Sequence, residues 1–101
     1  MDYQIIWSPR SLENFEEVIS LIAERNPAAA AKFGEFILHR VSALQNFPRL
    51  GARFAKLDRD DVRELAVPPW RVFYHLKEKQ RAVTIITIWH GAREEPDIAS
   101  E

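Results

Sequence analysis

Hydrophobic residues recur every three or four positions in two long segments near the start of the chain. In residues 9–25 they form one stripe with acidic residues opposite, made of Leu12, Phe15, Val18, Ile19 and Ile22. In residues 28–47 a second stripe is made of Phe33, Phe36, Ile37, Val41 and Leu44. This spacing is typical of amphipathic α-helices. We therefore expect two helices, each with one buried face.

The boundaries of both helices carry local signals. Ser8-Pro9 and Asn26-Pro27 place a side-chain oxygen just before a proline, which is typical of a helix start. The oxygen can accept a hydrogen bond from an orphan N–H, and proline at the first helical position has no donor to lose. Proline also disfavours helical backbone in the residue before it, so Pro27 ends the first helix. The short connection predicts a helical hairpin.

Runs of strand-forming residues flank the two helices. One run, residues 3–7, precedes them, and three runs follow at residues 62–67, 71–76 and 82–89. Short polar or proline-containing segments separate the last three runs, as in an antiparallel meander. The final run is apolar on both alternations, which is typical of a central strand.

The segment between the second helix and the meander, residues 49–61, has mixed charges and no sustained period. It is either a long loop that crosses back to the sheet or a loop with a short strand at 54–57. The element order β-α-α-β-β-β predicts an α+β fold, in which a helical hairpin packs on one face of a four-stranded, mainly antiparallel sheet and leaves the other face open. We expect one domain over residues 1–101, with a mobile tail from about 97.

Composition narrows the classes of function. The chain has no cysteine, and its three histidines lack the spacing of metal ligands, so we expect no metal and no cofactor. Its 14 basic and 15 acidic residues give a net charge of −1, which is not typical of a general nucleic-acid-binding protein. The start of the chain lacks a signal sequence, and no window approaches the roughly 18 apolar residues of a membrane span, so we expect a cytoplasmic protein.

Three motifs together resemble a known family. They are the opening Tyr-x-Ile-x-Trp-Ser-Pro pattern within residues 3–15, VRELAVPPWRVFYHL at 62–76 and IITIWHGAREE at 85–95. The chain resembles the RelE/ParE superfamily of bacterial toxins over nearly its whole length, although Trp70 stands where tyrosine is commoner. The resemblance implies a toxin of a type II toxin-antitoxin system. Its partner would be a cognate antitoxin of the ParD or RelB kind, wrapped near the helical hairpin and the sheet.

The superfamily contains two mechanisms on one fold, so the fold does not choose between them. RelE-like members cleave mRNA on the ribosome, and ParE-like members bind and poison DNA gyrase. Metal-free RNA cleavage needs a base, an acid and cations around one phosphate. The resemblance implies Arg63, Arg71 and Arg93 as phosphate-stabilising candidates and His90 as the candidate for proton transfer.

That catalytic set is incomplete, because no tyrosine follows Tyr74 and Gly91 follows His90. The His-Gly-Ala-Arg ending is also similar to ParE-like chains. We therefore expect inhibition of gyrase. The alternatives are a ribosome-dependent mRNA endonuclease and a degenerate, non-toxic member that only regulates its operon with the antitoxin.

Each arginine also has a structural interpretation. Arg63 alternates with Leu65 and Val67, so all three should share one face of a strand, where an arginine can serve in a buried ion pair. Arg71 can simply begin a strand, and Arg93 can neutralise a neighbouring glutamate on the surface.

The remaining candidates concern packing and partners. His90 can also be a hydrogen-bonded residue at a strand end. We expect no functional role for His39 or His75. The three tryptophans are expected at the core or its edge. An exposed Trp70 could anchor a partner protein, because tryptophan is enriched in interface hot spots. Arg53 and Lys56 are further candidates for contact with a partner.

Overall fold

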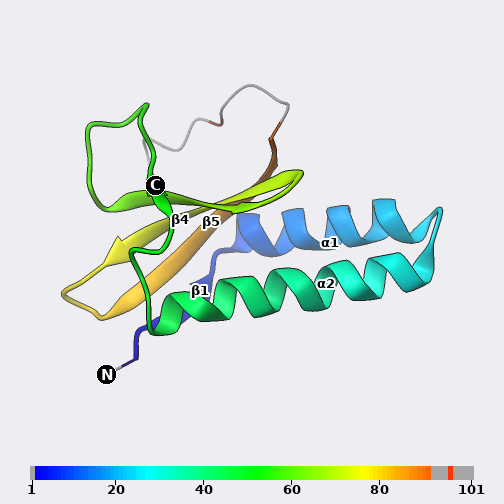
Figure 1. The fold of residues 1–101 in the computed structure, drawn as a ribbon, viewed down its shortest axis with the longest axis horizontal. Helices are drawn as coiled ribbons and strands as arrows, with labels where there is room; N and C mark the ends of the chain where they lie inside the picture. Colours follow the sequence, from blue (N-terminus) through cyan, green and yellow to red (C-terminus); the bar gives the residue numbers. More distant parts are fainter. Residues whose placement is uncertain (1, 92–95, 97–101) are drawn as a thin grey trace.

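The computed structural model describes residues 2–91 and residue 96, drawn in colour in Figure 1. Its elements in chain order are β1 (Gln4–Trp7), α1 (Pro9–Ala23), α2 (Pro27–Ser42), the 3₁₀ helix η1 (Ala43–Gln45), β2 (Ala52–Arg53), β3 (Val62–Val67), β4 (Trp70–Lys77) and β5 (Ala82–His90). The α+β fold and the three-strand meander are confirmed. None of the helices in the described residues is long and apolar enough to cross a membrane.

Both helices begin where the sequence predicts. The Ser8 hydroxyl accepts a hydrogen bond from the Ser11 amide at 3.1 Å. The Asn26 side chain does the same for the Ala29 amide, also at 3.1 Å. The second helix is shorter than predicted as an α-helix, because its last turn tightens into η1, which ends at Gln45.

The sheet has five strands in the order β1-β5-β4-β3-β2, one more than expected. β1 is parallel to β5, and the other neighbours are antiparallel. The additional strand is β2, in which Ala52 pairs with Glu64 and Arg53 pairs with Arg63. No strand forms at residues 54–57, where the alternative interpretation placed one. A two-residue strand is too short to have a hydrophobic period, so the sequence pattern could not reveal it.

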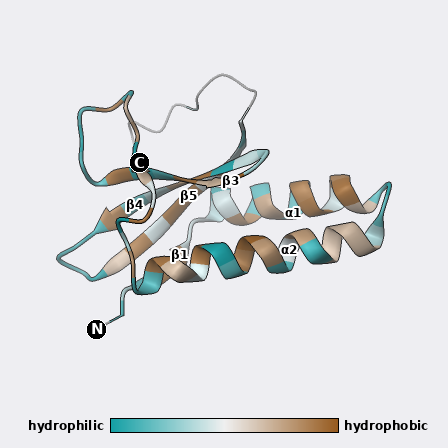
Figure 2. Ribbon diagram, in the orientation of Figure 1, coloured by the Kyte–Doolittle hydropathy of each residue, from teal (hydrophilic) through white to brown (hydrophobic). Residues whose placement is uncertain are grey.

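The main core lies between the sheet and the helical hairpin. Figure 1 shows α1 and α2 side by side on one side of the sheet, and Figure 2 shows hydrophobic and hydrophilic residues alternating along both helices. The buried residues of this core are Ile37, Val41, Leu44, Leu65, Val67, Val72, Tyr74, Leu76, Val83, Ile85 and Ile88. Trp7 and Trp70 pack against its edge, as expected of them. The far end of the hairpin extends beyond the sheet along the long axis of the molecule (Figure 1).

The face of the sheet away from the helices is only partly open, which corrects the expectation that it is uncovered. A second cluster consists of Phe54, Val62, Phe73 and Ile86, with Leu57 and Trp89 packed against it. The rings of Phe54 and Phe73 meet edge to face at 5.0 Å. Segment 54–61 therefore folds over this face, because burying the two rings removes apolar surface from water.

Candidate functional site

The register between β3 and β4 decides where the candidate arginines point. Arg63 pairs with Tyr74, and Ala66 pairs with Arg71. Successive side chains of a strand point to opposite faces, so Arg63 shares the helix-side face with Leu65 and Val67, as predicted. Arg71 lies on the other face. The two arginines therefore cannot converge on one phosphate from their places in the sheet.

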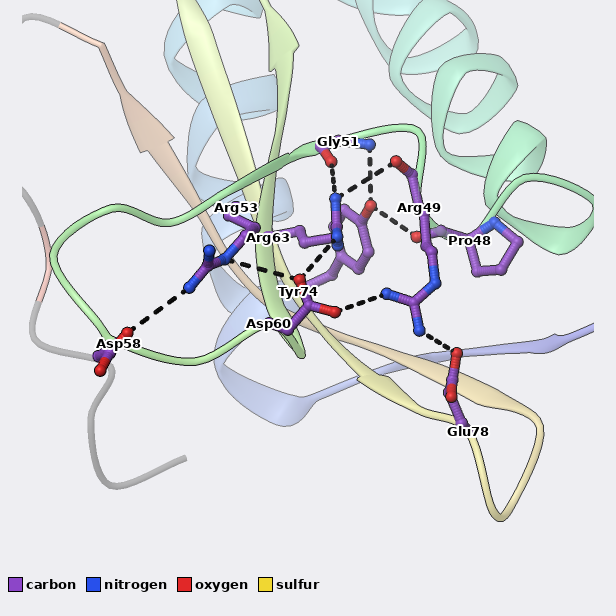
Figure 3. Close-up of polar contacts among 9 residues, drawn as sticks. All are labelled: Pro48, Arg49, Gly51, Arg53, Asp58, Asp60, Arg63, Tyr74 and Glu78. Atoms are coloured by element: carbon purple, nitrogen blue, oxygen red, sulfur yellow. Dashed lines mark hydrogen bonds and ion pairs between the residues drawn. The ribbon is translucent and has the colours of Figure 1, made fainter.

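The Arg63 guanidinium is held by backbone oxygens at the edge of the sheet (Figure 3). It donates hydrogen bonds to the Gly51 carbonyl at 2.8 Å and the Arg49 carbonyl at 3.4 Å. It also forms an ion pair with Asp60 at 3.1 Å, and its side chain is only 12% exposed. These contacts tie the segment after η1 to β3, which is the structural role that the sequence left open for this arginine.

Tyr74 holds the same segment through two hydrogen bonds of its hydroxyl (Figure 3). Its hydroxyl accepts a hydrogen bond from the Gly51 amide at 2.9 Å and donates one to the Pro48 carbonyl at 2.7 Å. Burial raises the pKa of Tyr74, so the hydroxyl keeps its proton as a donor. The segment after η1 is therefore fixed by backbone hydrogen bonds to two side chains of the sheet.

Arginines 49 and 53 continue this network on the surface (Figure 3). Arg49 forms ion pairs with Asp60 at 3.0 Å and with Glu78. Arg53, a sequence candidate for partner contact, lies 3.7 Å from Asp58 and 3.6 Å from Asp60. The aspartates of this loop thus offset its cations, and no concentrated basic patch forms around them. Lys56, the other partner candidate from this loop, is exposed.

Arg71 lies on the far face of the sheet beside a carboxylate. Its guanidinium donates a hydrogen bond to Glu64 at 3.0 Å, and both side chains are 22% exposed. The guanidinium carbon also lies 5.2 Å from the centre of the Phe73 ring, a cation–π distance. A phosphate that approached Arg71 would therefore meet the negative charge of Glu64 as well.

His90 lies on the helix side of the sheet. It pairs with Trp70 in the register, and the two rings meet edge to face at 5.0 Å. Trp70 in turn contacts Phe33 of α2 at 6.1 Å. His90 and Arg71 are thus separated by the sheet. The fourth candidate, Arg93, lies outside the described residues.

A second ionisable cluster was missed by the sequence interpretation, which gave His75 no role. The Asp61 carboxylate lies 2.8 Å from the His75 ring and accepts two hydrogen bonds from Arg59 at 2.9 Å. These hydrogen bonds from Arg59 hold the pKa of Asp61 well below its usual value. Asp61 and His75 line a shallow hollow beside the β4–β5 turn. Asp61 and His75 are fourteen positions apart in the sequence, so no local pattern indicated their contact.

The arrangement limits the chemistry open to the described residues. An RNA-cleaving site must bring a base, an acid and cations to one phosphate. Arg63 and His90 lie on the helix side, Arg71 lies on the far side, and each contacts a partner within the chain. The described candidates therefore do not meet at one phosphate-sized site.

The helical hairpin on a five-stranded mixed sheet places the chain in the RelE/ParE-like fold class. A solved structure of a chromosomal ParDE toxin-antitoxin system from P. aeruginosa superposes with a TM-score of 0.71, at 19% identity, over 87% of this chain and 95% of that one. The isolated E. coli RelE toxin superposes with a TM-score of 0.64, at 14% identity, over 92% and 88% of the two chains. At these identities the likeness shows the fold.

Sequence comparison adds the family. Residues 5–95 match the family described as the ParE toxin of the type II toxin-antitoxin system parDE. Toxin RelE1 of Caulobacter vibrioides is 26% identical over 93 residues, which are 90% of this chain and 96% of that protein. The chain belongs to the ParE toxin family, within the RelE/ParE superfamily of type II toxins. The resemblance stated from the three motifs is confirmed.

Proposed function

We propose that this toxin arrests growth by binding DNA gyrase, without cutting nucleic acid, and that a cognate antitoxin neutralises it. The observation that carries the proposal is the separation of the RNA-cleavage candidates. Arg63 and His90 lie on the helix side of the sheet, and Arg71 lies on the far side. A mechanism by protein contact needs no such convergence.

Charge supports the same conclusion. Catalysis of phosphate cleavage requires cations that are free to stabilise developing negative charge. Arg71 instead donates to Glu64, and Arg63 donates to backbone carbonyls and Asp60. Displacing these partners would cost part of the binding energy that cleavage needs. The choice of gyrase rests on the ParE family and on the His-Gly-Ala-Arg ending at residues 90–93.

The antitoxin partner is supported by the solved relatives. One is a ParDE system, and another is the RelBE2 toxin-antitoxin complex from Mycobacterium tuberculosis, which superposes with a TM-score of 0.59 at 17% identity. We propose the corresponding assembly for this chain. The exposed apolar residues of its helices, among them Leu21 at 61% and Phe36 at 50%, provide surface that such a partner can bury.

One observation favours a second mechanism, ribosome-dependent mRNA cleavage. The relative Toxin RelE1 covers 90% of this chain and carries the name of the RelE branch. In that mechanism Arg71 would act as a phosphate clamp, and Arg93, which lies outside the described residues, would be a further candidate.

Controlled induction in bacterial cells separates the two mechanisms. Plasmid supercoiling and transcript 5′ ends are measured in the same culture, with an Arg71→Ala variant and an Arg25→Ala variant as a matched surface control. Loss of negative supercoiling with intact transcripts, and retained toxicity of Arg71→Ala, supports gyrase binding. Codon-phased transcript cuts that disappear in Arg71→Ala would instead establish the nuclease. No growth effect from a stably folded chain would leave only the operon-regulating alternative.

A further inference from the structure

The outer face of α1 carries four exposed glutamates. Glu13, Glu16, Glu17 and Glu24 line one hollow along this helix, together with Ser20 and Leu21. All four are exposed, and within the described part of the chain none of them forms an ion pair or a side-chain hydrogen bond. This contrasts with the loop at 49–61, where the acidic residues pair with arginines.

This arrangement is unfavourable for the isolated helix. Glu13 lies three and four positions from Glu16 and Glu17, and like charges at these spacings repel on a helix surface. Glu24 is the C-cap of α1, where the helix dipole disfavours a negative charge, and the last turn of α1 has no basic residue. A cationic surface brought against α1 would relieve both effects.

An apolar groove adjoins the acidic stripe. Its lining consists of Asn14, Glu17, Val18, Leu21, Trp70, Ile88 and Trp89. Glu17 and Leu21 belong to both the groove and the acidic hollow, so the two features form one continuous surface. Leu21 is 61% exposed, the second most exposed large hydrophobic residue described after Phe47 at 64%. We call this surface the acidic groove.

We propose that the acidic groove is the docking site of a cationic amphipathic segment of the antitoxin. Apolar side chains of that segment fill the groove beside Leu21 and Trp70, and its lysines or arginines lie against the glutamates. The inference rests on the antitoxin partner proposed above and adds the surface and the charge of the docked segment. It also gives Trp70, a partner candidate from the sequence, a defined place in an interface.

Charge complementarity favours this occupant over two others. Nucleic acid is repelled by four exposed carboxylates. In a second copy of the chain, Arg49, Arg53, Arg59, Arg63 and Arg71 already form ion pairs with its own acids, so only its other cations could face the glutamates. A basic segment from a different protein fits both the charge and the exposed leucine.

The test measures the affinity of the purified chain for its separately purified antitoxin by isothermal titration calorimetry at low and high salt. One variant removes charge (Glu13→Gln, Glu16→Gln and Glu17→Gln together), and a second removes the apolar anchor (Leu21→Gln). Matched controls on α2 are Glu35→Gln and Leu38→Gln, both at exposed positions. Thermal unfolding of each variant verifies that it folds.

The expected result is a Kd raised about tenfold or more by either groove variant and unchanged within about twofold by the controls. The Kd of the natural chain should also rise with salt, and this rise should shrink when the three glutamates are replaced. A complex whose Kd is the same in groove and control variants overturns the inference and leaves the antitoxin partner standing. Failure to form any complex contradicts the proposed function itself. Self-association of the chain that is lost in Leu21→Gln would assign the groove to a second copy and contradict the inference.

Discussion

The Gly51 amide donates a hydrogen bond to the Tyr74 hydroxyl at 2.9 Å, across 23 positions of sequence. This bond joins the middle of the sheet to the segment that leaves the helical hairpin. The same hydroxyl donates to the Pro48 carbonyl at 2.7 Å, so one side chain satisfies two backbone groups. The link explains why residues 48–51 lie close against the sheet although they have no regular structure.

Glycine is required at position 51 because no space remains for a side chain. A Cβ there would lie 2.7 Å from the Glu64 carbonyl oxygen and 2.8 Å from Cε1 of Tyr74. Gly51→Ala should lower the free energy of unfolding by about 1–3 kcal/mol, because backbone must move. Urea denaturation measures the loss. Gly34→Ala is the control, since its Cβ meets side-chain ends, Ile19 at 3.3 Å and Phe15 at 3.8 Å, and no backbone. Equal stability of the two variants would contradict the packing described.

Removing the Tyr74 hydroxyl should also destabilise the chain. Tyr74→Phe leaves the Gly51 amide and the Pro48 carbonyl without their partner in a buried place. We expect the free energy of unfolding to fall by about 1–3 kcal/mol. Tyr3→Phe is the control, because the contacts of Tyr3 with Arg81, the core and the Gln45 carbonyl are made by its ring and its backbone amide, which phenylalanine keeps. A Tyr74→Phe variant as stable as the natural chain would show that water or a rearranged loop replaces the hydroxyl.

Phe54 should prove to be the residue that closes the far face of the sheet. It is 1% exposed and packs on Phe73, so Phe54→Ala should cost about 3–5 kcal/mol of stability. Amide hydrogen exchange in β4 and β5 should quicken at the same time. Phe47→Ala, at a residue that is 64% exposed, should change stability by less than about 0.5 kcal/mol. Similar losses in both variants would mean that segment 54–61 does not cover the sheet.

Stability should depend on pH through Asp61. Hydrogen bonds from Arg59 lower the pKa of this carboxyl in the folded chain below its usual value of 3.8. A lowered folded-state pKa stabilises the fold above the unfolded pKa, and this contribution is lost as the pH falls through and below that value. Asp61→Asn should therefore be less stable than the natural chain at pH 6, and the difference should narrow at about pH 3.

Urea denaturation at the two pH values tests this, with Asp58→Asn as the control. The Asp58 side chain is fully exposed, and its ion pair with Arg53 at 3.7 Å lies on the surface, so Asp58→Asn should change stability little at either pH value. A constant difference between Asp61→Asn and the natural chain at both pH values would contradict the assignment.

The parts of the fold that could be predicted from the sequence depend on local patterns. Ser8 and Asn26 each cap a helix through the amide three residues later, so both helix starts could be predicted correctly. The runs at 62–67 and 82–89 are rich enough in strand-forming residues to give the bounds of their strands within a residue. β2 was missed because two residues carry no period, and the cover from Phe54 was missed because its partner Phe73 lies nineteen positions away.

The candidate site depends on register, which the pattern alone leaves open. Val67 pairs with Trp70 across the two-residue turn at 68–69, and this register places Arg63 and Arg71 on opposite faces. A shift of one residue would exchange the faces of a strand. The sequence interpretation began the second strand of this pair at Arg71 instead of Trp70. It therefore did not reveal that the two arginines lie on opposite faces. The contact of His75 with Asp61 likewise needs the loop to fold back, which no short motif encodes.

The most direct test of the proposed mechanism is a supercoiling assay with purified DNA gyrase, relaxed plasmid, ATP and the purified chain. We predict that the chain inhibits supercoiling in proportion to its concentration, that Arg71→Ala inhibits equally well, and that prior addition of the antitoxin restores activity. Full gyrase activity at a saturating concentration of folded chain, in a preparation that cleaves mRNA on ribosomes, would contradict the proposed mechanism.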